Sequence, residues 1–276
     1  MKVLFISDAH LQTRHTRGYQ NLLAFLGSLR GKGNGNGTGN GNGNGKAVVR
    51  PGDSKGDQKP ITDVDDLYIL GDFFDFWFST GDFIYPEFRD IVEMLRELKE
   101  RGIRIHLCEG NHDFFLADYF ARHLGMEVIT DWATINLEGK RVLISHGDTV
   151  DDRNRRYLLL RRFLRSSFFY KMQKAMPVAL LWRIAQLSSR ASKGLTAETV
   201  DALARKMRIF SKRKFRDGFD AVILGHCHGH LLETSTVNGK QRIMVLLGDW
   251  LRHYSYLCYE DGNFALATFR PPHKRS

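Results

Sequence analysis

Five short motifs in this sequence place aspartate, asparagine or histidine directly after an apolar run. Their polar residues are Asp8 and His10, Asp72, Asn111 and His112, His146, and His226 and His228. Carboxylate and amide oxygens and neutral imidazole nitrogens are ligands that suit Mn, Fe or Zn. In Asp-x-His and His-x-His, both side chains lie on the same side of an extended chain, because side chains alternate with a period of two. Each pair can therefore reach one metal cluster.

Asp72 is the ligand on which the others are expected to converge. Residues 67–70 form a continuous apolar run that ends in Gly71 and Asp72, which predicts a buried parallel strand with a ligand at its carboxyl end. The two oxygens of one carboxylate can bridge two cations, and cations about 3.5–4 Å apart can hold a phosphate and generate hydroxide at neutral pH. A single motif of this kind is more often a turn or a buried structural histidine. Five of them favour a dinuclear site.

Apolar runs and periodicity predict the elements that position these residues. The predicted strands cover 2–7, 67–70, 103–108, 221–224, 230–237, 241–247, 254–259 and 264–269, with a hairpin joining 128–137 to 141–145; the predicted helices cover 19–29, 87–101 and 114–124. Strands alternating with helices indicate an α/β fold. Cys227, between two predicted ligands, is expected to point away from the metals and to be structural. His106 and His230 are expected to be non-ligands.

Composition narrows the class of protein. The 276 residues carry a formal net charge of +10, and the three scattered cysteines (Cys108, Cys227 and Cys258) argue against a disulfide framework and fit a reducing compartment. The first eight residues predict a strand rather than a signal peptide. No apolar run approaches the ~18 residues that a membrane span needs. These features predict a cytoplasmic protein.

Residues 31–62 are predicted to be a disordered surface insertion. Glycine alternates strictly with other residues from Gly33 to Gly45, so the stretch has little apolar surface to bury and much backbone entropy to lose. A glycine-rich phosphate loop is the alternative. Such a loop needs a strand before it and a helix N-terminus after it, and neither is predicted here.

Residues 153–216 are predicted to be a helical cap inserted in the domain. They hold 18 Lys and Arg and only two acidic residues, interleaved with large apolar groups. This composition suits a surface that takes an acyl chain beside anionic head groups, and cations over the site would attract a pyrophosphate. The expected substrate contacts are Arg155, Arg156, Arg161, Arg190 and Lys193, together with Asn111 of the strand-end motifs. An ordinary charged helical face and a nucleic-acid footprint are the competing interpretations, but no nucleic-acid-binding motif accompanies the stretch.

The order of the five motifs resembles that of the calcineurin-like metallophosphoesterases, and the resemblance spans nearly the whole chain. It implies one domain over residues 1–276, folded as a four-layer α/β/β/α sandwich around two divalent cations. By this resemblance Asp8, His10, Asp72 and His228 hold one cation, and Asp72 (as the bridge), Asn111, His146 and His226 hold the other. His112 stands where many members have a residue that stabilises or protonates the leaving oxygen. Asp113 is the neighbouring carboxylate that is expected to orient its imidazole.

A narrower resemblance is to the UDP-2,3-diacylglucosamine pyrophosphatases of lipid A biosynthesis. It rests on residues 71–77 (Gly-Asp-Phe-Phe-Asp-Phe-Trp), on residues 146–149 followed by two aspartates, and on the arginine-rich insertion. It implies hydrolysis of the substrate's pyrophosphate to UMP and 2,3-diacylglucosamine 1-phosphate, usually with Mn²⁺, by an enzyme peripheral on the inner membrane. That family commonly has Arg in place of His112, and Thr and Arg in place of Cys227 and Gly229.

Two other functions remain open from the sequence. One is a phosphodiesterase acting on nucleotides or nucleic acid, built on the same site. The other is a non-catalytic metal-binding adaptor, which is disfavoured because all seven ligand positions are filled.

Overall fold

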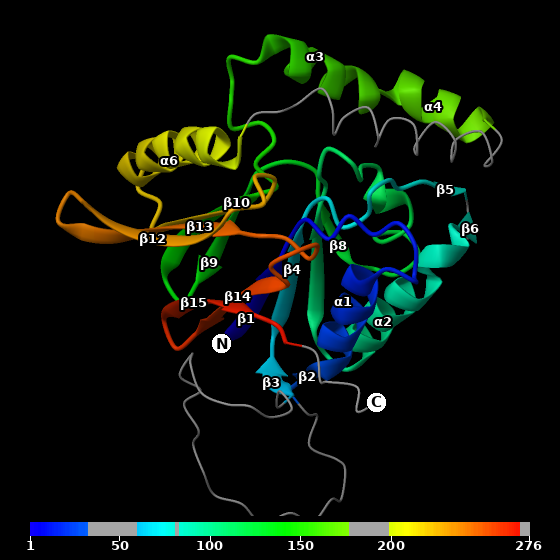
Figure 1. Ribbon diagram of the computed structural model, residues 1–276, viewed down its shortest axis with the longest axis horizontal. Helices are drawn as coiled ribbons and strands as arrows, with labels where there is room; N and C mark the ends of the chain where they lie inside the picture. Colours follow the sequence, from blue (N-terminus) through cyan, green and yellow to red (C-terminus); the bar gives the residue numbers. More distant parts are fainter. Residues whose placement is uncertain (33–59, 81–82, 177–198, 271–276) are drawn as a thin grey trace, which may run out of the picture.

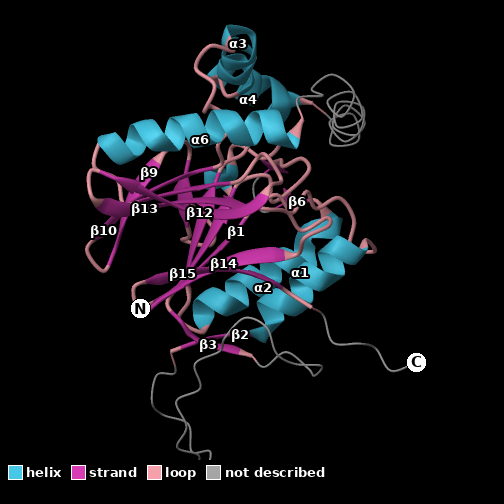
Figure 2. Cartoon of the chain, turned by 60° about the vertical axis from the view of Figure 1, so that its left-hand side comes forward, coloured by secondary structure: helices cyan, strands magenta, loops and turns pink. Residues whose placement is uncertain are grey.

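The computed structural model describes residues 1–32, 60–80, 83–176 and 199–270, and its framework is a pair of mixed β-sheets packed face to face (Figures 1 and 2). The first sheet has the order β15-β14-β1-β4-β7-β8. Its strands are β1 (Lys2–Ile6), β4 (Asp66–Leu70), β7 (Arg104–Cys108), β8 (Glu127–Ile129), β14 (Ser255–Glu260) and β15 (Asn263–Thr268). The four strands β1, β4, β7 and β8 run parallel, and β14 and β15 close one edge antiparallel.

The second sheet has the order β12-β13-β11-β10-β9. Its strands are β9 (Ala133–Leu137), β10 (Lys140–Ser145), β11 (Ala221–Leu224), β12 (His230–Val237) and β13 (Lys240–Leu247). The central strands β10, β11 and β13 are parallel, and the outer strands pair with them antiparallel. Two short pairs stand apart from the sheets: β2 (Leu29–Gly31) with β3 (Ile61–Val64), and β5 (Ser79–Thr80) with β6 (Phe83–Ile84).

Helices cover the outer face of each sheet and complete the four layers. α1 (Arg17–Ser28) and α2 (Arg89–Glu100), which follows the 3₁₀ turn η1 (Pro86–Phe88), pack on the first sheet, and α6 (Val200–Arg216) packs on the second (Figure 2). Alternation along β1 explains the layering: Leu4 and Ile6 join the core under α1 and α2, while Val3 and Phe5 join the core between the sheets. The α/β/β/α architecture predicted from the sequence is confirmed.

Two further helices form a separate layer over the strand ends. α3 (Arg155–Leu164) and α4 (Ser167–Ala175) lie above the sandwich, with the loops that follow β4, β7 and β10 beneath them (Figure 1). We call α3 and α4 the cap. The predicted helical character of residues 153–216 holds for the cap and for α6, and residues 177–198 lie outside the described residues. Within the described ranges, no helix is both long enough and apolar enough to cross a bilayer.

Three local predictions need correction. Residues 128–137 do not form one strand: β8 pairs with β7 in the first sheet, and β9 starts the second sheet, so the chain changes sheets between them. Residues 114–124 do not form a regular helix. Phe115 has φ +62°, and the backbone N–H of Leu116 donates to the Glu109 carboxylate, so only the 3₁₀ turn η2 (Leu116–Asp118) and irregular turns follow.

The third correction concerns the boundaries of the glycine-rich insertion. Gly31 belongs to β2 and Ile61 to β3, and these two strands pair in parallel at the base of the insertion. The predicted insertion is therefore narrower than residues 31–62. Residues 33–59, to which the prediction of disorder mainly applies, lie outside the described residues.

Candidate metal centre

The carboxyl ends of the central parallel strands bring the seven predicted ligands to one place. Three overlapping groups have ligand atoms within 4.8 Å of one another: Asp8, His10 and His228; His10, Asp72 and His112; and Asp72, His146 and His226. Asn111 joins them because its Oδ1 lies 3.0 Å from Nε2 of His146. Residues separated by more than 200 positions in the sequence therefore share one site.

Asp72 occupies the junction of these groups. Its Oδ2 lies 3.7 Å from Nε2 of His10 and 3.3 Å from Nε2 of His146, so one carboxylate oxygen faces histidines of both sides. Its Oδ1 accepts a hydrogen bond from the backbone N–H of His112 at 2.9 Å. The carboxylate is buried, and the neighbouring histidines hold its pKa well below its usual range although burial alone would raise it. Asp72 is thus an ionised carboxylate between two clusters of nitrogen and oxygen ligands.

Asp8 is fixed in a similar way. Its Oδ2 accepts hydrogen bonds from the Ser7 hydroxyl at 2.5 Å and from the backbone N–H of His226 at 2.9 Å. Its Oδ1 then faces His10 and His228, whose Nε2 atoms lie 3.9 and 3.8 Å away. The side chain is completely buried, so these contacts define its orientation.

The backbone at the site is held in an unusual conformation. Five of the predicted ligands have positive φ: Asp8 (54°), His10 (43°), Asp72 (49°), His226 (64°) and His228 (55°). Non-glycine residues adopt this left-handed region infrequently, and such residues concentrate at functional sites where the surrounding fold imposes the geometry. Gly71 also has positive φ (81°), and a side chain would not fit there because a Cβ would come within 2.7 Å of the His146 ring. Close packing around these residues therefore fixes their positions.

The electrostatics of the cluster favour positive charge. Burial lowers the pKa of His10, but the hydrogen bond that its ring donates to Asp75 and the charges of Asp72 and Asp8 outweigh this and raise it to about 9. For His146, burial likewise lowers the pKa, and the charge of Asp72 and its hydrogen bond raise it to about 10. In contrast, burial and the charge on His146 lower the pKa of His226 to about 4. The carboxylates thus attract cationic charge to the interior of the site.

The donor set fits divalent metal ions. Nε2 of His10 is buried among carboxylate oxygens and has no hydrogen-bond partner among the described residues, which leaves a lone pair or proton unsatisfied. A cation there would satisfy it. The mixture of imidazole nitrogens with carboxylate and amide oxygens suits Mn, Fe or Zn. This chemistry agrees with the two ligand sets expected from the sequence, which share Asp72.

Three outer contacts hold the ligand imidazoles, and two of the residues that make them were missed by sequence reasoning. Asp249 Oδ2 lies 3.3 Å from Nδ1 of His228, and Asp75 Oδ1 lies 3.5 Å from Nδ1 of His10. His146 donates from Nδ1 to the Leu70 carbonyl oxygen at 3.0 Å. Such partners fix ring orientation and tautomer. A signal existed for both carboxylates: Asp75 closes the Gly-Asp-x-x-Asp motif, and Asp249 follows β13 in a further strand-Gly-Asp pattern.

The expected role of Asp113 is corrected by its contacts. It does not orient the His112 ring, because its two oxygens accept four backbone N–H groups, those of Asp72, Phe73, Phe74 and Gly110, at 2.7–3.1 Å. Asp113 therefore ties the loop of Asp72 to the loop of Asn111. The ring of His112 instead donates from Nδ1 to the Asp75 carbonyl oxygen at 3.2 Å.

The cap is joined to the ligand loops by buried charges. Arg165, between α3 and α4, donates to Glu109 Oε2 at 2.8 Å, to the Gly110 carbonyl oxygen at 2.7 Å and to the Thr130 carbonyl oxygen at 2.8 Å. Gly110 directly precedes the ligand Asn111. The cap is therefore bonded to a loop of the metal centre.

Of the expected substrate contacts, the structure gives Arg161 a different partner. Its Nε donates to Asp148 Oδ2 at 2.8 Å, beside a bond from the Tyr157 hydroxyl at 2.6 Å, so Arg161 fastens the cap to the loop after β10. Its expected contact with substrate stays a prediction. Arg155 and Arg156 are exposed on α3. Arg190 and Lys193 lie outside the described residues. Cys227 is buried in the core under α6, as predicted.

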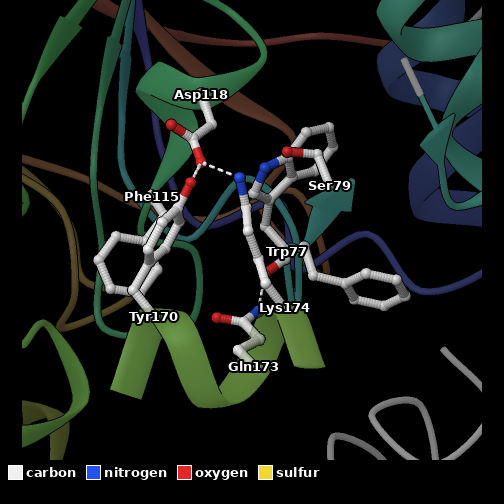
Figure 3. A pocket seen from close by; sticks show the side chains of 8 residues that line it. Trp77, Ser79, Phe115, Asp118, Tyr170, Gln173 and Lys174 are labelled. Carbon is white, nitrogen blue, oxygen red and sulfur yellow. Dashed lines mark hydrogen bonds and ion pairs between the residues drawn. The ribbon is translucent and has the colours of Figure 1, made fainter. Parts of the chain in front are cut away.

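A small cavity marks the contact of α4 with the sandwich (Figure 3). The hydroxyl of Tyr170 and Nζ of Lys174 both approach the Asp118 carboxylate, the latter at 3.2 Å. The space holds about 10 Å³, enough for about one water molecule. It is too small for a substrate. The residues around it join the cap to the sandwich.

The chain is similar to several known proteins. A family model described as calcineurin-like phosphoesterase matches residues 1–230. A UDP-2,3-diacylglucosamine hydrolase of Pseudomonas entomophila is 32% identical over 207 residues, covering 74% of this chain and 85% of that protein. One of Azotobacter vinelandii is 34% identical over 209 residues, covering 74% and 84%. A solved archaeal phosphodiesterase covers 98% of this chain at 12% identity, with a TM-score of 0.44.

Proposed function

Because the chain belongs to the calcineurin-like phosphoesterase family, we propose that this metal-dependent phosphoesterase hydrolyses the pyrophosphate of UDP-2,3-diacylglucosamine to UMP and 2,3-diacylglucosamine 1-phosphate. The observation that carries the chemistry is the convergence of seven ligands with Asp72 at their centre. The names of relatives 29–34% identical to the chain support the choice of substrate.

Two divalent cations, proposed to be Mn²⁺, fit the two ligand sets. When bound, such cations neutralise phosphate charge and lower the pKa of water. The protein orients the side chains that would hold these cations. Asp72 and Asp8 are held by backbone and hydroxyl donors, so their oxygens are oriented before substrate arrives. Preorganised charges of this kind stabilise a transition state without rearranging during the reaction.

His112 is the proposed contact to the reacting phosphate. Its Nδ1–H is bound to the Asp75 carbonyl oxygen, so the other ring nitrogen remains for the substrate. The group that leaves a pyrophosphate is itself a phosphate, which departs as an anion. The proposed task of His112 is therefore to stabilise negative charge on a phosphate oxygen.

The cap supports a lipid substrate and a peripheral position on the inner membrane. Its two helices expose Leu159 (71%), Leu160, Phe163 and Phe168 (67%), which is unusual for large apolar side chains. Basic residues such as Arg155, Arg156 and Arg162 share α3 with them. Apolar groups beside cations suit contact with acyl chains and anionic head groups.

The direct test is hydrolysis of UDP-2,3-diacylglucosamine in mixed micelles with Mn²⁺, measured as UMP release. We expect turnover by the wild type and a loss of 100-fold or more in Asp72→Asn, with the exposed Asp90→Asn as the matched control. Turnover of bis(p-nitrophenyl) phosphate without any turnover of the lipid substrate would indicate a nucleotide or nucleic-acid phosphodiesterase instead. Metal binding without turnover of either compound would indicate a non-catalytic protein.

A further inference from the structure

A cleft lies beside the candidate metal centre. It has a volume of about 430 Å³, and its walls include His228, His230, Asp249, Arg252, His253 and Val200. Of these residues, only His228 belongs to the ligand set. The other residues of the cleft therefore have no part in holding the proposed cations.

One imidazole ring separates the cleft from the metal centre. Nε2 of His228 lies 3.8 Å from Asp8 Oδ1 on the metal side, and its Nδ1 lies 3.3 Å from Asp249 Oδ2 on the cleft side. A molecule whose phosphate is held at the cations therefore has the cleft directly next to that phosphate.

Asp249 lines the cleft beside His228, and its carboxylate oxygens are already engaged by donors of the protein. Its Oδ1 accepts the backbone N–H groups of Leu251, Arg252 and His253 at 3.0, 2.7 and 3.2 Å, and its Oδ2 lies 3.3 Å from Nδ1 of His253 as well as from that of His228. The carboxylate is buried beneath these donors. The turn contributes Arg252 and His253 to the lining of the cleft.

Arg252 is available to a ligand. It is exposed, and within the described part of the chain it has no acidic side chain within 4.0 Å. Three imidazoles also line the cleft, those of His228, His230 and His253, and the ring centroids of His230 and His253 lie 5.6 Å apart. Among the described residues that line the cleft, Asp249 is the one carboxylate, and its oxygens already accept hydrogen bonds.

The start of α6 adds a further positive contribution. Val200 is the first residue of this 17-residue helix and lines the cleft, and Thr199 caps the helix by accepting the N–H of Ala202. The N-terminus of a helix carries partial positive charge and unpaired N–H groups that favour anions. The helix N-terminus and the 249–253 turn thus both border the same space, and the first turn of α6 also carries the acidic Asp201.

We propose that this cleft is an anion subsite that binds a second phosphate of the substrate while the first is held at the metal centre. The inference rests on the proposed phosphoesterase function and assigns the substrate class: pyrophosphate conjugates are preferred over simple phosphodiesters. The planar fork of Arg252 matches two oxygens of a phosphate, and His253 and His230 complete the wall.

Binding of UDP and of UMP to the Mn²⁺-loaded protein tests this subsite. Calorimetry at equal free Mn²⁺ is expected to show that the wild type binds UDP at least 10-fold more tightly than UMP. Arg252→Gln is expected to reduce that ratio about 10-fold, since hydrogen bonds to charged groups are worth a factor of this order. Arg252→Lys is expected to retain part of the preference for UDP over UMP. Arg89→Gln makes the same charge change at an exposed position of α2 and is expected to retain all of it.

Two results overturn the subsite: equal affinity of the wild type for UDP and UMP, or an unchanged ratio in Arg252→Gln. Failure of the proposed function gives a different pattern. If the protein prefers UDP through Arg252 but does not hydrolyse UDP-2,3-diacylglucosamine, the subsite stands and the substrate assignment fails. If it hydrolyses that substrate while Arg252→Gln keeps the UDP preference, the subsite fails and the function stands.

Discussion

Asp249 holds the metal-facing His228 from behind: its Oδ2 lies 3.3 Å from Nδ1 of the ring, while Nε2 of the same ring faces Asp8 at 3.8 Å. A carboxylate in this position fixes which nitrogen carries the proton and which can bind a cation. The same carboxylate shapes the turn of residues 249–253, so one buried side chain organises both the metal centre and the adjoining cleft.

Asp249→Asn should weaken metal binding. Loss of the charged partner of His228 removes its fixed orientation, and changes of this kind reduce metal affinity about 10–100-fold. Calorimetric titration with Mn²⁺ measures the effect, with the exposed Asp261→Asn as control. Wild-type affinity in Asp249→Asn would show that the contact does not position the ligand.

Gly71→Ala should disrupt the centre by collision as well as by backbone strain. Gly71 has φ +81°, and a Cβ there would lie 2.7 Å from the His146 ring. Gly102→Ala is the matched control, since Gly102 has φ +89° but open space around its Cβ position. We expect about 1 kcal/mol of destabilisation at Gly102 and at least about 2 kcal/mol more at Gly71. Chemical denaturation measures both, and equal losses would contradict the collision.

Asp66 should make the free energy of unfolding depend on pH in the acid range. Burial raises the pKa of its carboxyl, but bonds from Arg104 and His106 outweigh this and lower it from 3.8 to about 2. A folded-state pKa below the unfolded value stabilises the fold above about pH 4, and the contribution is lost as pH falls towards 2. Asp66→Asn should therefore cost about 2 kcal/mol at pH 6 and much less at pH 2. Urea titrations across this range check it, and a loss independent of pH would exclude an ionic origin.

Arg165→Gln should loosen the cap. The guanidinium makes three bonds to the sandwich, one of them to the Glu109 carboxylate, and removal leaves that buried carboxylate without its charged partner. We expect a loss of about 2–3 kcal/mol in cap docking. Limited proteolysis within α3 and α4 should then be faster by an order of magnitude or more. Arg162→Gln, on the exposed face of α3, should leave the cleavage rate at the wild-type value, and equal rates in the two variants would refute the anchoring role.

Local patterns in the sequence predicted the alternation of strands and helices and the polar residues at the strand ends, whereas the order of the layers was implied by the resemblance to the calcineurin-like metallophosphoesterases. An apolar run ending in Gly71-Asp72 needs no tertiary information to be recognised as a strand with a polar end. The role of Asp113 was not predictable in this way. Adjacency to His112 suggested a contact, but the chain turns so that Asp113 points into the backbone of the Asp72 loop. In the sequence, Arg161 and Arg165 look like the exposed arginines near them. Only the folded structure shows that these two bond to the sandwich.

The central claim is that two cations share Asp72. Its most direct measurement is elemental analysis of the Mn²⁺-saturated protein together with its electron paramagnetic resonance spectrum, in the wild type and in Asp72→Asn. The account predicts two manganese ions per chain with a spin-coupled signal, and loss of that coupling in the variant. A single uncoupled ion in the wild type, or coupling that survives in Asp72→Asn, would contradict it.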